Sequence, residues 1–285
     1  MAEITAAMVK ELREQTQLPM MKCKKALQAA DGDMEKAKED LRKQGESFMD
    51  GRGDRSTEEG RIALFTSPAG GAIVELQVES APVAGNEEVI AFANDLAEQL
   101  ATGPGAATEE ELLGQPSPSK EGMTLKEVRD DIVNRIREVF RIPRMHRVDG
   151  PCGGYVHHDG KTGVLLEAEG GDADLAKNIG MQVVAMKPLA ATKDELDPAV
   201  VKAEEDIQKD RARQEGKPEN IIEKMIIGRM KNFYAEKVLA EQPYILDDKQ
   251  TVGKVAKAGG MTIKGFTLWK LGETSDAEEP AAAAG

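Results

Sequence analysis

A hairpin of β-forming residues followed by a helix occurs twice in this chain, and this repetition constrains the fold more than any other feature. In the first copy, β-forming residues over 61–78 predict two paired strands, and a helix is expected over 86–100. In the second copy, a hairpin is expected over 154–169, with its turn at Asp159-Gly160, a dipeptide that favours tight hairpin turns. A helix is expected next, over 172–186. The repetition predicts an α+β core of two related subdomains.

Three short helices are expected ahead of this core, within residues 5–45. Thr5 can cap the first helix, Pro19 suits the first helical position of the second, and Gly45 can close the third. About 45 residues in three helices make a small bundle, and a module of that size more often binds a partner than catalyses a reaction. Residues 46–60, rich in Gly, Asp, Glu, Arg and Ser, are expected to form a linker.

Two further segments interrupt the repeated pattern. A polar stretch over 102–124, rich in proline and glycine, predicts a mobile loop. It is followed by an expected helix over 125–140 and an expected strand over 142–148. Helical patterns over 198–240 predict an antiparallel helical hairpin. This hairpin interrupts the second subdomain, because a strand is still expected over 265–271.

Each helix of that hairpin carries an apolar stripe, and the two stripes are expected to face each other. The first stripe is Val200, Ala203 and Ile207, and the second is Ile222, Met225, Arg229 and Phe233, with a charged interruption. The expected domains of the chain are a three-helix bundle over 1–45, a linker over 46–60, a first core subdomain over 61–149, a second core subdomain over 150–197 and 241–272, the helical hairpin over 198–240, and an acidic, alanine-rich disordered tail over 273–285.

Composition and charge narrow the classes of function. The 285 residues carry a net charge of -13, which disfavours direct nucleic-acid binding. No apolar run approaches the ~20 residues of a membrane span, and the first residues do not resemble a secretory signal. Cys23 and Cys152 lie far apart with no CxxC context, which argues against a disulfide framework and a zinc site. We therefore expect a cytoplasmic protein.

The usual catalytic patterns are missing from the sequence. It has no phosphate-binding GxxxxGK[ST] loop, no GxGxxG after a strand and no HExxH. His157 and His158 are adjacent on an expected strand and would point to opposite faces, which disfavours a shared metal ion. Cys23 lies on an expected buried helical stripe, where a structural role is more common than a nucleophilic one. We expect no catalytic residue, no metal and no cofactor, and so an interaction protein rather than an enzyme.

Two adjacent methionines begin the second expected helix. Met20, Cys23 and Leu27 form one apolar stripe, and Met21 falls off it. Two interpretations stay open at this point. The methionines fill irregular gaps in the core of the bundle, or Met21 contacts a partner protein.

Several motifs in order along the chain resemble the bacterial elongation factor Ts family, and the resemblance covers nearly the whole chain. The motifs are Leu12-Arg13-Glu14-Gln15-Thr16, Met20-Met21-Lys22-Cys23-Lys24-Lys25-Ala26-Leu27, Gly154-Tyr155-Val156-His157, Gly163-Val164-Leu165, Met181-Gln182-Val183-Val184-Ala185-Met186, Glu215-Gly216-Lys217-Pro218, Gly228-Arg229 and Gln242-Pro243-Tyr244. The resemblance implies a ubiquitin-associated-like N-terminal domain, a core of two subdomains that each carry a three-stranded antiparallel sheet backed by helices, and a projecting helical hairpin.

The resemblance also implies a function. The family binds the G domain of elongation factor Tu·GDP and promotes GDP/GTP exchange by disturbing the magnesium and phosphate contacts, without binding a nucleotide itself. Arg13, Met20 and Met21 match family positions that contact the G domain, and His157 matches a contact position of the core domain. Read without the family, Arg13 is an exposed helix charge and His157 a satisfied strand histidine.

One family motif is altered in this chain. After the first hairpin the family usually shows Thr-Asp-Phe-Val, whose aromatic ring wedges into the partner near the magnesium site, and here the residues are Ser80-Ala81-Pro82-Val83. Three explanations are open: Pro82 is a smaller, stiffer wedge, the partner carries a compensating change, or the remaining contacts supply most of the exchange activity. We favour the third, with Pro82 still near the magnesium site. The alternative function is an elongation factor Tu-binding protein with weak or no exchange activity.

A second departure lies just before the methionines. The family's Thr-Gly-Ala-Gly-type loop is Thr16-Gln17-Leu18-Pro19 here, so proline stiffness replaces glycine freedom. We expect the loop to survive with a more fixed helix start.

Overall fold

A computed structural model describes residues 4–50 and 54–273 of the chain. The fold is α+β, as expected from the sequence, with small three-stranded sheets and three N-terminal helices. The chain divides into two compact units. The first takes in the chain up to Phe65, Ala72–Arg147 and the chain from Lys270, and the second takes in Thr66–Gly71 and Val148–Trp269.

The first unit begins with a bundle of three helices, α1 (Ala6–Thr16), α2 (Met20–Ala29) and α3 (Met34–Asp50). Its core is small and includes Leu12, Cys23, Leu27 and Leu41, all fully or almost fully buried. The Thr5 side chain caps α1 by accepting a hydrogen bond from the backbone N–H of Met8.

Two boundaries of the bundle differ from the prediction. Pro19 is the N-cap of α2 rather than its first helical residue. Gly45 does not end α3, which continues to Asp50 through part of the predicted linker. A glycine inside a helix costs only about 1 kcal/mol relative to alanine, so flanking helix-forming residues and packing against α7 outweigh it. Residues 51–53 of the linker lie outside the described chain.

The bundle is fastened to helix α7 (Leu125–Ile136) of the same unit by polar contacts. Arg42 of α3 forms ion pairs with Glu127 at 3.0 Å and Asp131 at 3.6 Å. The amide of Asn134, itself buried, donates to the backbone oxygen of Leu41 at 2.6 Å. These contacts connect residues about ninety positions apart, so no local pattern could predict them.

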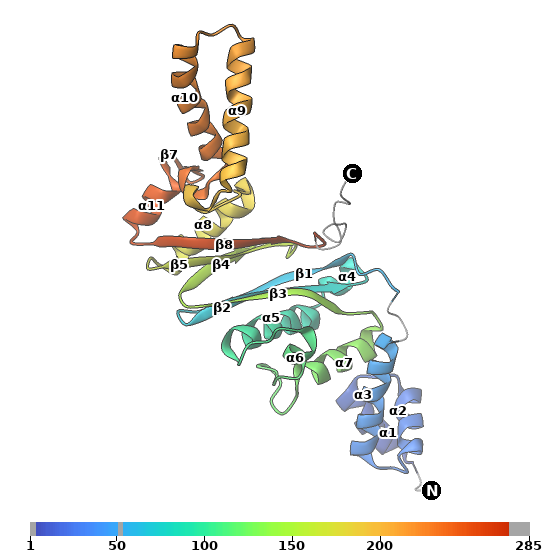
Figure 1. The fold of residues 1–285 in the computed structure, drawn as a ribbon. Helices are drawn as coiled ribbons and strands as arrows, with labels where there is room; N and C mark the ends of the chain where they lie inside the picture. Colours follow the sequence, from blue (N-terminus) through green and yellow to red (C-terminus); the bar gives the residue numbers. More distant parts are fainter. Residues whose placement is uncertain (1–3, 51–53, 274–285) are drawn as a thin grey trace. The chain divides into compact units, whose positions relative to one another are not determined.

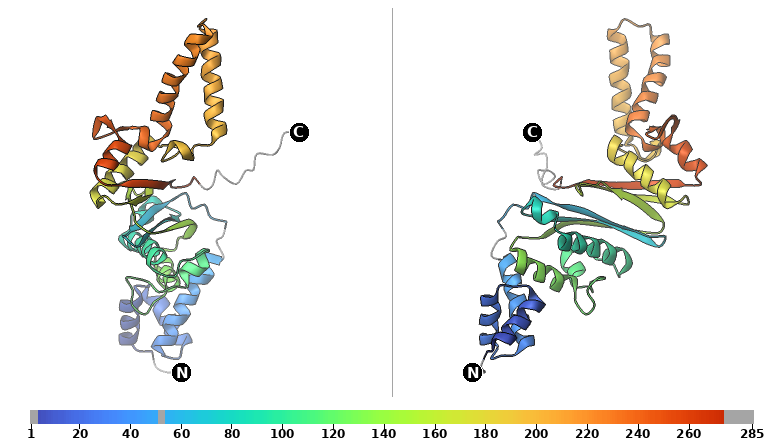
Figure 2. Two further views of the ribbon diagram at one scale, coloured as in Figure 1. Left: turned by 60° about the vertical axis from the view of Figure 1, so that its left-hand side comes forward. Right: turned by 180° about the vertical axis from the view of Figure 1, so that it is seen from behind.

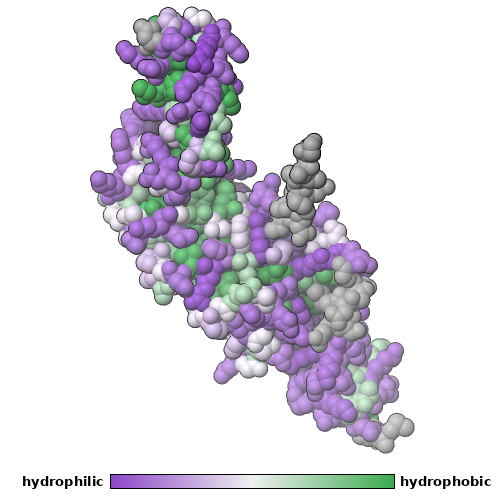
Figure 3. Space-filling model, in the orientation of Figure 1, coloured by the Kyte–Doolittle hydropathy of each residue, from purple (hydrophilic) through white to green (hydrophobic). Residues whose placement is uncertain are grey.

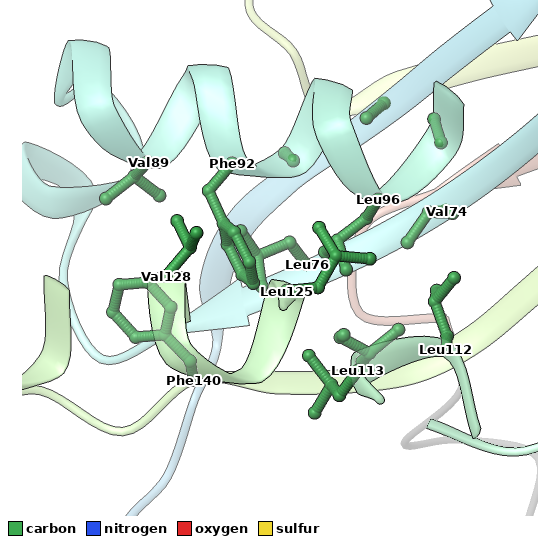
Figure 4. Close-up of a cluster of buried hydrophobic side chains, with 14 of the residues drawn as sticks. Val74, Leu76, Val89, Phe92, Leu96, Leu112, Leu113, Leu125, Val128 and Phe140 are labelled. Atoms are coloured by element: carbon green, nitrogen blue, oxygen red, sulfur yellow. The ribbon is translucent and has the colours of Figure 1, made fainter. Parts of the chain in front are cut away.

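The rest of the first unit is a sheet with helices on one face (Figures 1 and 2). The strands, in the order β1-β2-β3, are β1 (Glu59–Thr66), β2 (Gly70–Val78) and β3 (Arg141–Asp149). The helices on the sheet are α5 (Glu87–Thr102), α6 (Glu109–Leu113) and α7. Apolar side chains from the strands and helices meet between them, and Phe92 of α5 lies with its ring centroid 6.4 Å from that of Phe140 (Figure 4). The Asn86 side chain caps α5, as its sequence position indicates.

The segment predicted as a mobile loop over 102–124 is instead packed onto this core. It contains α6, whose Leu112 and Leu113 are buried against the other helices. Ser117 and Ser119 both donate hydrogen bonds to the buried carboxylate of Asp95 in α5. The predicted helix over 125–140 is also too long, because α7 ends at Ile136 with Arg137 in the left-handed conformation.

The second unit has its own three-stranded sheet, in the order β4-β5-β8. Its strands are β4 (Cys152–Val156), β5 (Thr162–Glu169) and β8 (Thr262–Lys270). Strands β4 and β5 form the predicted antiparallel hairpin, with Tyr155 opposite Val164. Helix α8 (Ala173–Met186) lies on the sheet, and glycines let the backbones approach closely, because a Cβ at Gly153 would fall 2.4 Å from that of Ala176.

Helices α9 (Pro198–Gln214) and α10 (Glu219–Lys237) form the predicted helical hairpin, which projects from the rest of the second unit (Figure 1). The predicted stripe on α9 is wrong, whereas the predicted stripe on α10 is confirmed in part, because Ile222 is buried between the helices and Phe233 packs against the buried cluster that contains it. Val200 and Ile207 are 43% and 46% exposed, and the buried side chains are Ala212, Ile222, Ile226 and Met230. Apolar atoms therefore remain on the outside of the hairpin (Figure 3).

Part of the interface that α9 offers to α10 is polar. Arg229 of α10 reaches across to it, pairing with the Glu215 carboxylate at 2.8 and 3.0 Å and contacting the backbone oxygen of Gln208 at 3.4 Å. This half-buried cation and its partly exposed carboxylate partner occupy part of the interface that periodicity assigned to apolar residues.

Several short elements were not predicted from the sequence. They are α4 (Ala81–Ala84), the 3-10 turns Lys193–Glu195 and Leu239–Glu241, β6 (Pro243–Tyr244), β7 (Asp247–Thr251) and α11 (Val252–Ala258). Among the described residues, no helix is long and apolar enough to cross a membrane. The predicted tail beyond residue 273 lies outside the described chain.

Candidate partner-binding sites

The start of α2 carries the two methionines on the surface of the bundle. Met20 is 53% exposed and Met21 is 64% exposed, whereas Cys23 and Leu27 are fully buried. The prediction that Met20 shares the core stripe with Cys23 and Leu27 is therefore wrong, and so is the interpretation that both methionines fill gaps in the core. Two large apolar side chains standing in solvent are an available anchor for a partner protein.

The turn before α2 holds these methionines in place. Gln17 closes α1 in the left-handed conformation, with its N–H donating to the Arg13 carbonyl at 2.8 Å. Leu18 is buried and packs with Cys23 in the core of the bundle, an arrangement that fixes the angle at which the chain enters a helix. Thr16 accepts a hydrogen bond from the N–H of Leu18 at 3.4 Å. These contacts fix the turn between α1 and α2.

Basic residues lie in the same part of the first unit as the methionines. Arg13 lies exposed on α1, and among the described residues none pairs with its guanidinium. Burial, and then the nearby charge of Arg137, lower the pKa of Lys22 from its ordinary value. Arg137 stands at the end of α7, so the core contributes to this basic surface, a feature that sequence reasoning missed. A chain with net charge -13 thus presents a local basic and apolar surface, suited to an acidic or polar partner face.

Residues Ser80–Val83 form the start of the short helix α4, directly after β2. Ser80 is the N-cap, and Ala81 and Pro82 are exposed at the first helical positions. Val83 packs partly against the core of the first unit, and Ala84 is buried in it. The exposed residues Ala81 and Pro82 therefore form an apolar corner, and the buried residue Ala84 is the base that attaches it to the core.

His157 follows β4 in the second unit and is half-buried. Its backbone N–H donates to the Thr162 oxygen at 2.8 Å, and its Nδ1 lies 3.1 Å from the hydroxyl of Tyr155. The argument that His157 and His158 point to opposite faces of a strand is wrong, because β4 ends at Val156 and the two rings touch with centroids 4.3 Å apart. The described residues contain no group of three or more metal-binding side chains.

The predicted residues thus form two groups. Arg13, Met20 and Met21 lie in the first unit together with the Ser80–Val83 segment, and His157 lies in the second. All of these predicted positions expose at least part of their surface. The arrangement offers an exposed contact surface on each of the two units.

Comparison with known proteins decides the family. The profile of the family described as Elongation factor TS matches residues 82–273. The chain belongs to the elongation factor Ts family. Elongation factor Ts of Methylococcus capsulatus is 40% identical over 281 residues, covering 97% of this chain and 94% of the relative. Elongation factor Ts of Hyphomonas neptunium is 42% identical over 288 residues, covering 96% and 93%.

A third relative, elongation factor Ts of a Hydrogenobaculum species, is 37% identical over 270 residues, covering 94% of this chain and 99% of its own. These matches extend over the N-terminal bundle, which precedes the part matched by the family profile. The protein is accordingly a translation elongation factor.

Proposed function

We propose that this elongation factor binds the G domain of elongation factor Tu·GDP and accelerates the release of GDP, so that GTP can replace it. The observation that carries the proposal is the pair of exposed methionines, 53% and 64% accessible, on a rigid helix start in a chain of this family. The role requires binding alone, and the protein acts as an exchange factor in the cytoplasm without forming a covalent intermediate.

The proposed mechanism couples binding of the factor to weakening of the nucleotide. Mg²⁺ bridges the phosphates of GDP and protein oxygens, and it demands near-octahedral geometry, so a small displacement of its ligands lowers its affinity. Met20 and Met21 supply the anchor, Arg13 contributes charge, and the Ala81-Pro82 corner approaches the magnesium site. Coupling between two ligands is reciprocal, so GTP binding in turn releases the factor.

The same proposal assigns unequal shares to the contact sites. Proline presents much less apolar surface than the family's phenylalanine, so Pro82 gains less binding free energy from its contact with the partner. Both methionines are available for burial, and His157 offers a second contact from the core. We infer that the methionines and the remaining contacts supply most of the activity and that Pro82 adds to it. The bundle, two core subdomains and projecting hairpin are the domains we assign to this role.

Stopped-flow release of fluorescently labelled GDP from elongation factor Tu tests the proposal. The protein should accelerate release in proportion to its concentration, up to a plateau. A titration of binding, run in parallel, separates the alternative function, in which the protein binds elongation factor Tu·GDP and leaves GDP release at its spontaneous rate. The absence of the Asp-Phe pair favours that alternative, and the exposed methionines with His157 favour exchange.

A further inference from the structure

Two chain segments in the first unit hold each other by exchanged hydrogen bonds. One follows strand β2 and the other precedes strand β3, two strands that are neighbours in the sheet. The Glu79 carboxylate accepts from the N–H of Val139 at 2.9 Å. In return the Glu138 carboxylate accepts from the N–H of Ser80 at 3.1 Å and from its hydroxyl at 2.6 Å. Each side chain thus satisfies the backbone of the opposite segment.

The bond to Glu138 changes what Ser80 does at the helix start. An N-cap serine usually accepts a hydrogen bond from the first turn of its helix. Ser80 caps α4 in an extended conformation, yet its side chain makes no cap hydrogen bond and donates to Glu138 instead. Hydrogen bonds to a carboxylate are shorter and stronger than neutral ones, and two of them from one residue fix its orientation. The N-terminal end of α4 is therefore held by Glu138.

The other end of α4 is held by a half-buried arginine. Arg61 of β1 donates from Nη1 to the carbonyl oxygen of Ala84 at 3.2 Å. Burial lowers the pKa of Arg61. Among the described residues, its Nε is the buried side-chain nitrogen that has no hydrogen-bond partner. Val83 and Ala84 pack on the core between these two anchors. Only Ala81 and Pro82 of the helix stand in solvent.

We propose that Glu138 is a positioning residue for nucleotide exchange: by holding Ser80, it fixes the short helix that presents Ala81 and Pro82 to the nucleotide site of the partner. The inference rests on the proposed exchange function. Without an aromatic ring, Pro82 can displace residues of the partner only if its own backbone does not move. A contact surface that is already held in its bound conformation loses less conformational entropy on binding. Proline fixes one backbone angle of the corner, and Glu138 fixes the base from which it projects.

The test is a series of variants that remove the bonds to Ser80 one at a time. Glu138→Gln keeps one acceptor oxygen, Ser80→Ala removes the hydroxyl, and Glu138→Ala removes both bonds. Glu121→Gln, an exposed carboxylate of the same unit with no interaction partner among the described residues, is the matched control. The plateau rate of GDP release and the half-saturating factor concentration are measured for each variant, with thermal unfolding alongside.

The plateau rate should fall about fivefold in Glu138→Ala and about twofold in the two single-bond variants, as expected for net hydrogen-bond losses of this size. The half-saturating concentration should stay within about twofold, because the methionines still bind. Combining Ser80→Ala with Glu138→Gln should cost less than the product of the two single effects, because both act on one contact. An unchanged plateau in Glu138→Ala overturns the inference, and so does a loss confined to the half-saturating concentration.

A measurement on the free protein separates this inference from the proposed function. The N–H of Ser80 donates to Glu138, and that of Ala84 donates to the Ser80 carbonyl at 3.1 Å. Amide hydrogen exchange at both positions should quicken in Glu138→Ala and stay unchanged in Glu121→Gln. Unchanged protection in Glu138→Ala refutes the positioning role without reference to any partner. If the unaltered protein fails to accelerate GDP release, the proposed function fails instead.

Discussion

Replacement of both exposed methionines tests the proposed anchor most directly. Full burial of a methionine side chain contributes about 1.5 to 3 kcal/mol. Met20 and Met21 still expose 53% and 64% of their surface, and a partner can cover only that part. Scaled by these fractions, loss of both side chains should cost about 1.8 to 3.5 kcal/mol of binding free energy, or roughly 20- to 400-fold in Kd.

The assay is a titration of elongation factor Tu·GDP with the Met20→Ala, Met21→Ala double variant, together with stopped-flow GDP release. Below saturation the acceleration should fall by the same factor as the affinity. The double variant should unfold within about 0.5 kcal/mol of the unaltered protein, because neither side chain belongs to the core. Met186→Ala, at a methionine 44% exposed on α8 in the second unit, is the matched control and should leave Kd unchanged.

A Kd for the double variant within threefold of the unaltered value would refute the proposal that the methionines anchor the partner. Methionine side chains that a partner covers contribute more to the binding free energy than a threefold change in Kd represents. Intact acceleration in the double variant, combined with its loss in Pro82→Gly, would reverse our ranking of the contacts. The wedge would then supply most of the exchange activity, and the methionines would be surface residues of the bundle.

Three further predictions concern stability and reactivity. Leu27→Ala should destabilise the protein by about 2 to 5 kcal/mol, because a fully buried leucine leaves a cavity, and the loss should appear as a lower denaturant midpoint. Gly153→Ala should cost about 1 to 3 kcal/mol in the same measurement, because its Cβ would fall 2.4 Å from that of Ala176. Burial raises the pKa of Cys152, so less of its thiolate is present at pH 8 than in a free thiol; its alkylation should be slower than that of a model thiol and should rise above pH 9.

The candidate contact residues were predictable from motifs, but their accessibility was not. Helical spacing placed Met20 on the stripe of Cys23 and Leu27, yet the bundle leaves Met20 in solvent, because the three helices cover less of α2 than the stripe occupies. The hairpin shows the same limit. Periodicity selected Val200 and Ile207 for its interface, and both are exposed in the structure, whereas Ile222 of the other predicted stripe is buried there.

Local sequence was enough to specify the elements that depend on neighbouring residues. Asn86 caps α5, Asp172 caps α8, and Asp159-Gly160 turns the second hairpin, because caps and turns are made by side chains and backbone within a few positions. Contacts between segments far apart in the chain became visible only in the folded protein. Packing of Leu112 and Leu113 turned an expected mobile loop into part of the core, and Glu138 met Ser80 across 58 positions. Burial and partnership depend on which segments come together in space, and no local pattern encodes that.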